Sequence, residues 1–473
     1  MVFAGVSMRL VMKFGGASVA DGERIRHVAT LVRSYREQGH EIAVVTSAMK
    51  GVTDALLMAA RAASEKGDAD AVLKSVSDIR TQHERAAEVC IEHEPTREHV
   101  LDSIATLLDD LERALVGICY LGELTPRSLD YISSFGERLA APMLAGALQS
   151  IGVPSRSMDG MEAGILTDST HGDARPLDIT YERIAQRVAP LLEECVPVVG
   201  GFMGADERGV ITTLGRGGSD LTASLVGAGI GAHEIWLWKE TDGIMTTDPH
   251  LVPEARSLRQ ISYAEAMEMS YFGAKVLHPR AIEPAIRHSI PVRVKNTFHP
   301  EREGTLIVAD HVPSKSVVKA ITVIRNVALI TISGSGMIGT IGVAARVFSS
   351  LARAGVNIRM ISQGSSEANI SMVVDEAHAQ RAVRTLREEF RHNIVKDVSL
   401  NEHVCVVAVV GAGMIGTPGV AGRVFSTMGR NGINVIMISQ GSSQSNISFV
   451  IDERDARRAV AVLHEEFALH EIE

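Results

Sequence analysis

The sequence predicts an α/β protein: a mainly parallel sheet with helices on both faces, followed by a duplicated α+β unit. Three observations carry this prediction. Short apolar runs such as 10–14 and 41–49 are typical of buried strands, stretches with helical spacing separate them, and the last third of the chain repeats itself. Strand–helix alternation favours a parallel sheet. Ligands of such sheets bind at the carboxyl ends of the strands, so the polar loops there are the candidate sites.

Length and composition narrow the class of protein. A chain of 473 residues is too long for one ordinary core and suggests two or three domains. The net charge of −10 disfavours nucleic acid and anionic membranes as partners. Apolar stretches stay shorter than the ~18 residues of a membrane span. We therefore expect no nucleic-acid partner and no membrane partner.

Cysteine usage indicates a reducing compartment. The four cysteines are far apart in the sequence and form no C-x-x-C pair: Cys90, Cys119, Cys195 and Cys405. No histidine cluster has the spacing of metal ligands, so we expect reduced thiols in a cytoplasmic protein without a protein-built metal site. Residues 1–7 lack the basic and apolar regions of a secretion signal, and Met8 is a candidate start.

The first candidate loop is Lys13-Phe14-Gly15-Gly16. It ends an apolar strand and precedes residues 21–34, which have helical spacing. Glycines let backbone N–H groups approach an anion, the lysine adds a positive charge, and a helix N-terminus favours phosphate. The spacing G-x-x-x-x-G-K-[ST] of a Walker A loop is absent. Taken alone, the loop is equally typical of a tight turn with a surface lysine.

Three later segments combine glycines with charges and hydroxyls. The densest is 212–220, an arginine among glycines with a serine and an aspartate, followed by helical spacing over 221–231. Residues 239–249 carry acidic groups and hydroxyls, and 270–279 holds Lys275 beside a glycine. Each segment alone is more typical of a solvated turn. Their common position at one predicted sheet edge favours a ligand site.

The C-terminal third contains an internal repeat without gaps. Residues 335–340 recur as 412–417, and 361–366 recur as 438–443. Each copy predicts strand, helix, strand, strand and helix, a small α+β unit. Both copies carry G-x-G-x-x-G, which imitates a dinucleotide fingerprint. We reject that interpretation because each unit is too short for a Rossmann half and lacks the acidic partner of a ribose.

Together these motifs resemble the aspartate kinases of the amino-acid kinase family, over nearly the whole length from Met8. The motifs are KFGGASV at 13–19, VVTSAMKGVTD at 44–54, SFGERLAA at 134–141, GFMG at 201–204, TLGRGGSD at 213–220 and FGAKVLHPR at 272–280. Ala17 departs from the usual threonine. The repeat resembles the paired ACT units that follow the kinase domain in feedback-regulated members.

The resemblance implies an amino-acid kinase, or carbamate-kinase-like, sandwich over 8–297. A linker over 298–316 and two ferredoxin-like ACT units over 317–398 and 399–473 would follow. The apolar segment 317–324 could pair with either unit, so insertion of one unit into the other and strand exchange both stay open.

The implied activity is transfer of the γ-phosphoryl group of ATP, with Mg²⁺, to the β-carboxylate of L-aspartate. The product, 4-phospho-L-aspartate, begins lysine, threonine and methionine synthesis. An ionised carboxylate needs no general base, so alignment and charge neutralisation suffice. The alternatives are a related kinase for glutamate, acetylglutamate or a nucleoside monophosphate, and an amino-acid sensor with a degenerate kinase domain.

The resemblance also implies roles for residues. Lys13 and Lys275 would neutralise the phosphates, and Asp220 would orient these lysines or Mg²⁺. Arg216 would pair with the substrate α-carboxylate as a bidentate fork, and Glu137 would take the α-ammonium. The other substrate-binding residues would be Ser47, Thr53 and Ser219. The nucleotide would contact Lys13, Phe14, Gly15, Gly16, Ser47, Lys239, Glu240, Met245 and Asp248.

Two groups of residues depart from the family pattern or stay open. Lys239-Glu240 replaces a frequent Thr-Asp, and Met245 and His250 replace an aromatic residue and an arginine, so the adenine and ribose contacts are the least determined. Amides of the repeat could bind threonine or lysine as feedback effector, or could satisfy turn backbone: Asn357, Gln363, Asn369, Asn434, Gln440 and Asn446. The resemblance further implies a homodimer, or a dimer of dimers, formed through the ACT units.

Overall fold

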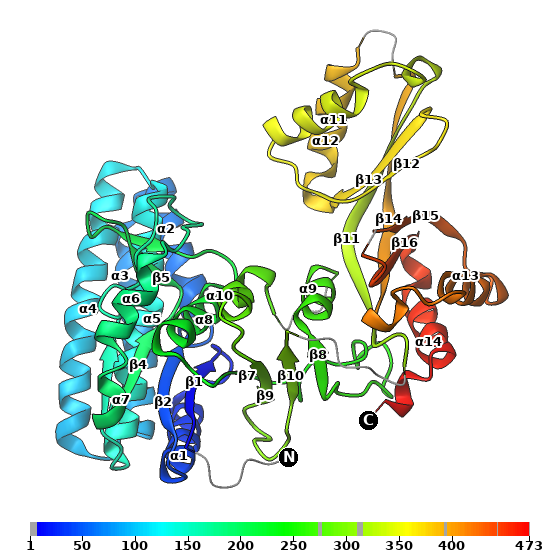
Figure 1. Cartoon of the computed structure of the whole chain (residues 1–473). Helices are drawn as coiled ribbons and strands as arrows, with labels where there is room; N and C mark the ends of the chain where they lie inside the picture. Colours follow the sequence, from blue (N-terminus) through cyan, green and yellow to red (C-terminus); the bar gives the residue numbers. More distant parts are fainter. Residues whose placement is uncertain (1–6, 273–276, 310–315, 392–394, 442, 473) are drawn as a thin grey trace. The chain divides into compact units, whose positions relative to one another are not determined.

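The computed structural model describes residues 7–272, 277–309, 316–391, 395–441 and 443–472 (Figure 1). The described residues divide into two compact units. The first comprises 7–244, 259–263 and 277–309, and the second comprises 245–258, 264–272 and the rest from 316 onward. Two short segments before residue 273 therefore belong with the C-terminal unit, although the sequence suggested a continuous first domain.

The first unit is built on an eight-stranded sheet. Its strands, in spatial order, are β3 (Ser155–Met158), β4 (Val196–Gly200), β2 (Glu41–Thr46), β1 (Arg9–Phe14), β7 (Glu234–Lys239), β9 (Val292–Asn296), β10 (Thr305–Val308) and β8 (Gln260–Ser262). All neighbours are parallel except β9 and β10. The prediction of an α/β fold with a mainly parallel sheet is confirmed. Strand β10 lies inside 298–316, the range expected as a linker.

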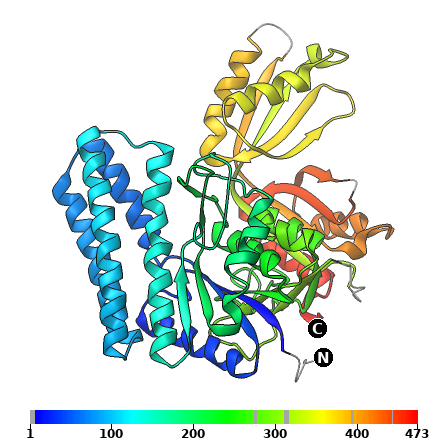
Figure 2. The same cartoon turned by 60° about the vertical axis from the view of Figure 1, so that its left-hand side comes forward.

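Helices cover both faces of this sheet. The long helices α2 to α5 stand side by side in Figures 1 and 2. The helices of this unit are α1 (Gly22–Glu37), α2 (Val52–Lys66), α3 (Ala69–Cys90), α4 (Glu94–Leu121), α5 (Pro126–Ser150), α6 (Ile179–Arg187), α7 (Leu191–Glu194), α8 (Gly218–Ile230) and α10 (Glu283–Arg287), with a hairpin of β5 (Met203–Ala205) and β6 (Ile211–Thr213). Within the described residues, no helix combines the length and the apolar character needed to cross a bilayer.

Side-chain alternation along β1 decides which face each residue serves, because successive residues of a strand point to opposite faces. Leu10, Met12 and Phe14 join the core that also contains residues of α1 to α5. Val11 faces α8 instead: a Cβ on Gly227 of α8 would lie 3.7 Å from Val11 Cγ2 and 2.6 Å from Cδ1 of Ile235. Lys13 has the parity of Val11, so its side chain is directed toward α8.

Helix α5 brings a carboxylate to the carboxyl end of the sheet. It begins after Thr125, whose side chain accepts a hydrogen bond from Ser128 N, and runs unbroken from Pro126 to Ser150. Gly136 allows a close approach to the loop after β2, since a Cβ there would lie 2.8 Å from Cβ of Ala48. The next residue, Glu137, is therefore held beside that loop.

The second unit contains a six-stranded antiparallel sheet in the order β12-β13-β11-β14-β16-β15. The first repeat consists of β11 (Ala320–Ser333), α11 (Val343–Arg353), β12 (Ile358–Gln363), β13 (Asn369–Asp375) and α12 (Glu376–Glu389). The second consists of β14 (Asp397–Val410), α13 (Val420–Arg430), β15 (Val435–Gln440), β16 (Asn446–Asp452) and α14 (Ala456–Glu466). The predicted element order of each repeat is confirmed. Each G-x-G-x-x-G run enters a short 3₁₀ turn, and the helix begins only after it.

The two repeats share their central strands. The first part of β11, Ala320 to Ile324, pairs with Val410 to Val406 of β14. Val318 and Ile321 lie in one core with Val407 and Phe449 of the second repeat. The remainder of β11 pairs with β13, and its Ala328, Ile330 and Ile332 belong to a separate core of the first repeat. The segment 317–324, which sequence could not assign, thus packs with the second repeat.

Helix α9 (Tyr263–Tyr271) is fixed to the second repeat by buried polar contacts. Lys319 Nζ lies 3.0 Å from Glu265 Oε2, with these side chains 4% and 0% exposed. Glu265 Oε1 accepts a hydrogen bond of 2.9 Å from Ala412 N, and Asn446 Nδ2 donates to Glu268 at 3.0 Å. A buried charge keeps its place only when paired, so this contact holds α9 firmly.

The Lys319–Glu265 pair generates a stability prediction. Lys319→Ala leaves a buried carboxylate without this cation and should destabilise the second unit by about 3 kcal/mol. Both tryptophans, Trp236 and Trp238, lie in β7 of the first unit. In urea unfolding of the full chain, the far-UV circular dichroism transition should move to lower urea while the tryptophan fluorescence transition stays in place.

The internal repeat supplies the matched control. Lys396 occupies the position of Lys319 in the first repeat, where it is exposed, and its backbone N–H donates to Ser333 O as Lys319 N–H does to Val410 O, both at 2.8 Å. Lys396→Ala should leave both transitions unchanged. An unchanged circular dichroism midpoint in Lys319→Ala would contradict the importance of the buried pair.

Candidate active site

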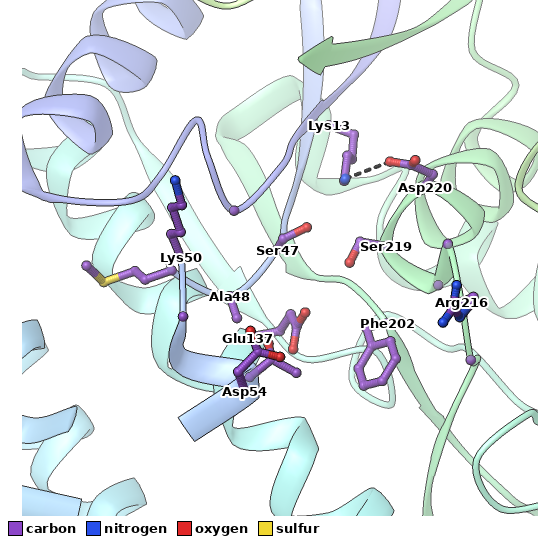
Figure 3. A pocket seen from close by; sticks show the side chains of 17 residues that line it. Lys13, Ser47, Ala48, Lys50, Asp54, Glu137, Phe202, Arg216, Ser219 and Asp220 are labelled. Atoms are coloured by element: carbon purple, nitrogen blue, oxygen red, sulfur yellow. Dashed lines mark ion pairs between the residues drawn. The ribbon is translucent and has the colours of Figure 1, made fainter. Parts of the chain in front are cut away.

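A cavity of about 380 Å³ opens at the carboxyl ends of β1, β2 and β4 (Figure 3). Its charged lining residues come from four stretches of the chain: Lys13, Lys50, Asp54, Glu137, Arg216 and Asp220. Hydroxyls of Ser47, Thr53 and Ser219 and the backbone of Gly16 complete much of the wall. Eight residues that the sequence singled out, from four motifs, therefore line one cavity: Lys13, Gly16, Ser47, Thr53, Glu137, Arg216, Ser219 and Asp220.

One buried carboxylate of the lining, Asp220, is held between two lysines. Lys13 Nζ lies 2.6 Å from Asp220 Oδ1 (Figure 3), and Lys239 Nζ donates to Asp220 Oδ2 at 2.8 Å. Asp220 sits in the first turn of α8, toward which the parity of β1 directs Lys13. The lysine after β1 and the lysine that ends β7 thus converge on one carboxylate.

The charges of this cluster follow from burial and pairing. Burial by itself would raise the pKa of Asp220, but Lys13 and Lys239 outweigh burial and lower the pKa to about 2. Burial lowers the pKa of Lys13, and the Asp220 carboxylate opposes that lowering. Asp220 is therefore ionised at neutral pH, and two lysines on one carboxylate leave an excess of positive charge for an anion.

Glycines and a helix end extend this anion site. A Cβ on Gly16 would lie 2.9 Å from Ala48 O, and one on Gly15 would lie 3.7 Å from Lys13 Nζ, so side chains there would fill the space beside the ammonium. Helix α8 starts after Gly217, which has φ +75° and provides no side-chain cap. Uncapped N–H groups and the helix dipole favour negative charge at that point. The loop after β1 and the start of α8 together suit phosphate groups.

Glu137 and Arg216 also line the cavity, and neither has an ion-pair partner among the described residues. Glu137 is 4% exposed, and no described residue gives its Oε2 a hydrogen bond. Burial raises the pKa of Glu137 to about 8. Arg216 has an exposed side chain, and the ion pairs among the described residues do not include it. A ligand with both an ammonium and a carboxylate would satisfy these two side chains.

The sequence reasoning did not select three further lining residues, Lys50, Asp54 and Phe202. Phe202 has φ +69°, a left-handed conformation that is costly for an aromatic residue and that clusters at ligand sites. Its N–H donates a hydrogen bond to a side chain, Thr222 Oγ1, at 3.1 Å. The motifs around Lys50 and Phe202 were visible in the sequence, but the conformation of Phe202 was not.

The residues expected to contact the nucleotide have different surroundings, and not all of them belong to the first unit. Phe14 is buried and stacks on Trp238 with 5.8 Å between ring centroids, so its side chain serves the core and only its backbone is near the cavity. Glu240 is exposed, and its Oε1 lies 3.4 Å from Arg24 Nη1. Met245 and Asp248 belong to the second unit, where Asp248 Oδ1 accepts from His250 N. Lys275 lies outside the described residues.

The amides proposed for an effector also have different surroundings. Gln363 lines a cavity of about 290 Å³ in the first repeat, together with Met337, Thr340 and Gly342. Asn446 is buried and bonded to Glu268 and Ser448, so it satisfies protein groups. The other four are exposed: Asn357, Asn369, Asn434 and Gln440.

Comparison with protein families assigns both parts of the chain. Residues 8–296 match the model of the amino acid kinase family, and residues 330–390 and 407–467 each match an ACT domain. The first match covers more than half of the chain, and the second falls on the two repeats.

Named relatives and solved structures agree with these matches. Aspartokinase 1 and aspartokinase 3 of Arabidopsis thaliana, both chloroplastic, are 37% and 36% identical over 97% of this chain and 80% and 81% of their own lengths. E. coli aspartokinase III in complex with aspartate and ADP superposes with a TM-score of 0.79 at 28% identity, covering 97% of this chain and 99% of that one. The predicted kinase and ACT folds are confirmed, and the chain belongs to the amino acid kinase family.

Proposed function

We propose that this chain is an aspartate kinase, which transfers the γ-phosphoryl group of ATP to the β-carboxylate of L-aspartate and forms 4-phospho-L-aspartate. The observation that carries the proposal is one cavity lined by the Lys13–Asp220 pair and also by Glu137 and Arg216, which have no ion-pair partner among the described residues. Relatives named aspartokinases, 35–37% identical to this chain, support it. So does the E. coli enzyme solved with aspartate and ADP.

At the phosphate end, Lys13 holds the transferred group. Its ammonium is kept in place by Asp220, 2.6 Å away, so it needs no reorganisation when charge develops on the phosphoryl oxygens. The N–H groups of Gly15 and Gly16 and the start of α8 add fixed dipoles. Lys239 fixes the second oxygen of Asp220. We assign Lys275 a second positive charge at the phosphates from the family motif.

At the substrate end, Arg216 takes the α-carboxylate and Glu137 takes the α-ammonium. A guanidinium presents a planar fork that matches a carboxylate in two parallel hydrogen bonds. Ser47, Thr53 and Ser219 supply hydroxyls along the wall between the two ends. The β-carboxylate of aspartate is ionised at neutral pH and attacks without a general base, so these contacts act by alignment.

The glycine loop suits the phosphates of ATP, whereas few protein side chains are available to bind Mg²⁺. No group of three or more acidic, histidine or cysteine side chains converges on a metal position within the described part of the chain. Both oxygens of Asp220 already meet lysines. Mg²⁺ would be held mainly by the phosphates of the nucleotide, where it would neutralise their charge. We therefore propose that Asp220 orients the lysines and does not bind Mg²⁺.

The same residues weigh against the alternatives. A nucleoside monophosphate or an acetylated amino acid carries no free ammonium for Glu137. Glutamate has both end groups but places its side-chain carboxylate one methylene further out. An amino-acid sensor with a degenerate kinase domain would not need the buried Lys13–Asp220 pair, whose desolvation is costly.

The ACT units are proposed to provide feedback regulation by lysine or threonine. The cavity lined by Gln363 in the first repeat is the proposed effector site, and a neighbouring enzyme, E. coli aspartokinase III, has been solved with lysine and aspartate. Exposed isoleucines lie on the repeats, with Ile341 fully exposed and Ile361 and Ile438 on the edge strands β12 and β15. These edges suit assembly of a dimer or a dimer of dimers. A cytoplasmic location and a place at the start of lysine, threonine and methionine synthesis complete the proposal.

The activity is tested by ATP consumption with L-aspartate, L-glutamate and UMP in turn, with hydroxylamine as trap. An acyl phosphate yields a hydroxamate, which we expect with aspartate alone. No hydroxamate from aspartate at any concentration would refute the proposal. Repeating the assay with lysine or threonine identifies the effector as the amino acid that lowers the rate.

Lys13→Ala should reduce kcat by about 10²- to 10³-fold, since a preorganised charge at the transferred group is lost. Aspartate should still bind, because its end groups meet Arg216 and Glu137. Steady-state kinetics give kcat, and isothermal titration calorimetry checks aspartate binding. A rate equal to that of the unaltered chain would remove the phosphate role from Lys13.

The affinity for aspartate should increase with pH. With a pKa of about 8, Glu137 is mostly protonated at pH 7 in the free site, whereas an ammonium ligand requires the carboxylate. Binding therefore releases a proton below pH 8, and KM for aspartate should fall up to about tenfold per pH unit before it levels off near pH 8. Glu137→Gln should abolish this dependence and raise KM at pH 8. The same slope in the variant would assign the titration to another group.

A further inference from the structure

A buried carboxylate, Asp130, lies behind the Arg216 turn, outside the set of lining residues. It is 2% exposed and belongs to α5, seven residues before Glu137. Seven residues are two helical turns, so Asp130 and Glu137 lie on one face of this helix. One face of α5 therefore carries both Glu137, which lines the cavity, and Asp130, which lies outside the lining.

Asp130 joins two segments that are distant from it in the sequence. Its Oδ2 accepts a hydrogen bond of 2.7 Å from His171 Nδ1, and Gly172 N donates to both oxygens at 3.0 and 3.1 Å. Thr213 Oγ1 donates to Oδ1. An ionised carboxylate can only accept, and these donors satisfy it fully while tying the 171–173 loop to the end of β6.

The Arg216 turn follows directly from this anchored strand end. Ala174 N donates to Thr213 O at 2.9 Å, which adds a backbone tie between loop and strand. Gly215 has φ +71°, and a Cβ there would lie 2.7 Å from Asp173 Oδ1 and 3.2 Å from Gly172 O. The main chain of the turn thus rests against the loop that Asp130 holds.

The other side of the turn is held as well. A Cβ on Gly217, which has φ +75°, would lie 2.7 Å from Cβ of His278. Arg280, two residues beyond His278, forms an ion pair with Asp173. Loop 171–173 therefore contacts the turn directly. Through Asp173 it also contacts Arg280, in the segment that packs on the other side of the turn.

Arg216 itself has no ion-pair partner among the described residues, and its side chain is exposed. Its direction is then set by the backbone of the Gly215–Gly217 turn. A guanidinium fork binds a carboxylate in two parallel hydrogen bonds only when it is aimed correctly, and a displacement of about 1 Å can cost up to ~100-fold.

We propose that Asp130 is a positioning residue that aims Arg216 at the substrate carboxylate through Thr213 and the Gly172 loop. The proposal rests on the function proposed above for Arg216. It makes Asp130 necessary for aspartate affinity, although Asp130 does not touch the substrate.

The test uses Asp130→Asn, which keeps the shape but replaces one acceptor oxygen with an amide that faces donors. KM for aspartate should rise about tenfold. KM for ATP should stay unchanged, and kcat should change less than KM. Glu234→Gln is the matched control: Glu234 is also a largely buried carboxylate with several donors, at the amino end of β7, and it should leave both KM values unchanged.

A double-mutant cycle separates aiming from general damage. Arg216→Lys retains the charge, so aspartate binding stays measurable, and a flexible lysine does not depend on the turn for its direction. Asp130→Asn should therefore weaken aspartate binding about tenfold in the original chain but less than twofold in the Arg216→Lys background. Dissociation constants come from isothermal titration calorimetry. Equal losses in both backgrounds would overturn the proposal.

Two further outcomes are decisive. If Asp130→Asn does not fold, Thr213→Val removes one donor while keeping the shape, and it should raise KM for aspartate by a smaller factor, again only with Arg216 present. If Arg216→Lys binds aspartate as tightly as the original chain does, the proposed role of Arg216 in binding aspartate is wrong. Normal KM values in Asp130→Asn and Thr213→Val, with weakened binding in Arg216→Lys, would refute the role of Asp130 alone.

Discussion

The ion pair between Lys13 and Asp220 depends on the alternation of side chains along β1. Because Lys13 has the parity of Val11, it is directed toward α8 and meets Asp220 at 2.6 Å. Phe14, one residue later, enters the opposite core and stacks on Trp238. A shift of one residue in this strand would bury the ammonium among apolar side chains and would empty the site. The catalytic geometry and the packing of the sheet are therefore set by the same constraint.

The two buried carboxylates of the cavity, Asp220 and Glu137, differ in their partners and in their pKa, and the difference matches their proposed roles. Asp220 has two lysine partners and stays ionised, which suits a fixed phosphate site. Glu137 is just as buried but lacks such a partner, and burial raises its pKa to about 8. An ionised carboxylate in that position is costly until a cation arrives. In the proposed function, a zwitterionic ligand supplies the charged partners of Glu137 and Arg216.

The internal repeat shows how similar sequences acquire different surroundings. Lys319 is buried against Glu265, whereas its counterpart Lys396 is exposed. Asn446 is bonded to Glu268 of α9, whereas Asn369 at the same position of the first repeat is exposed. Helix α9 makes these contacts with the second repeat, so the duplicated residues are structural in one copy and accessible in the other. This difference favours the first repeat as the place for an effector.

The sequence by itself determined the element order, the repeat and most residues of the cavity, because strand and helix periodicity and glycine-rich motifs are local signals. Lys13, Arg216 and Asp220 were selectable in this way. Only the tertiary structure decided that Lys239 shares Asp220, that β10 joins the sheet within an expected linker, and that Asp130 holds the Gly172 loop. These contacts depend on which segments, distant in the sequence, become neighbours in the fold. Local periodicity does not encode that arrangement.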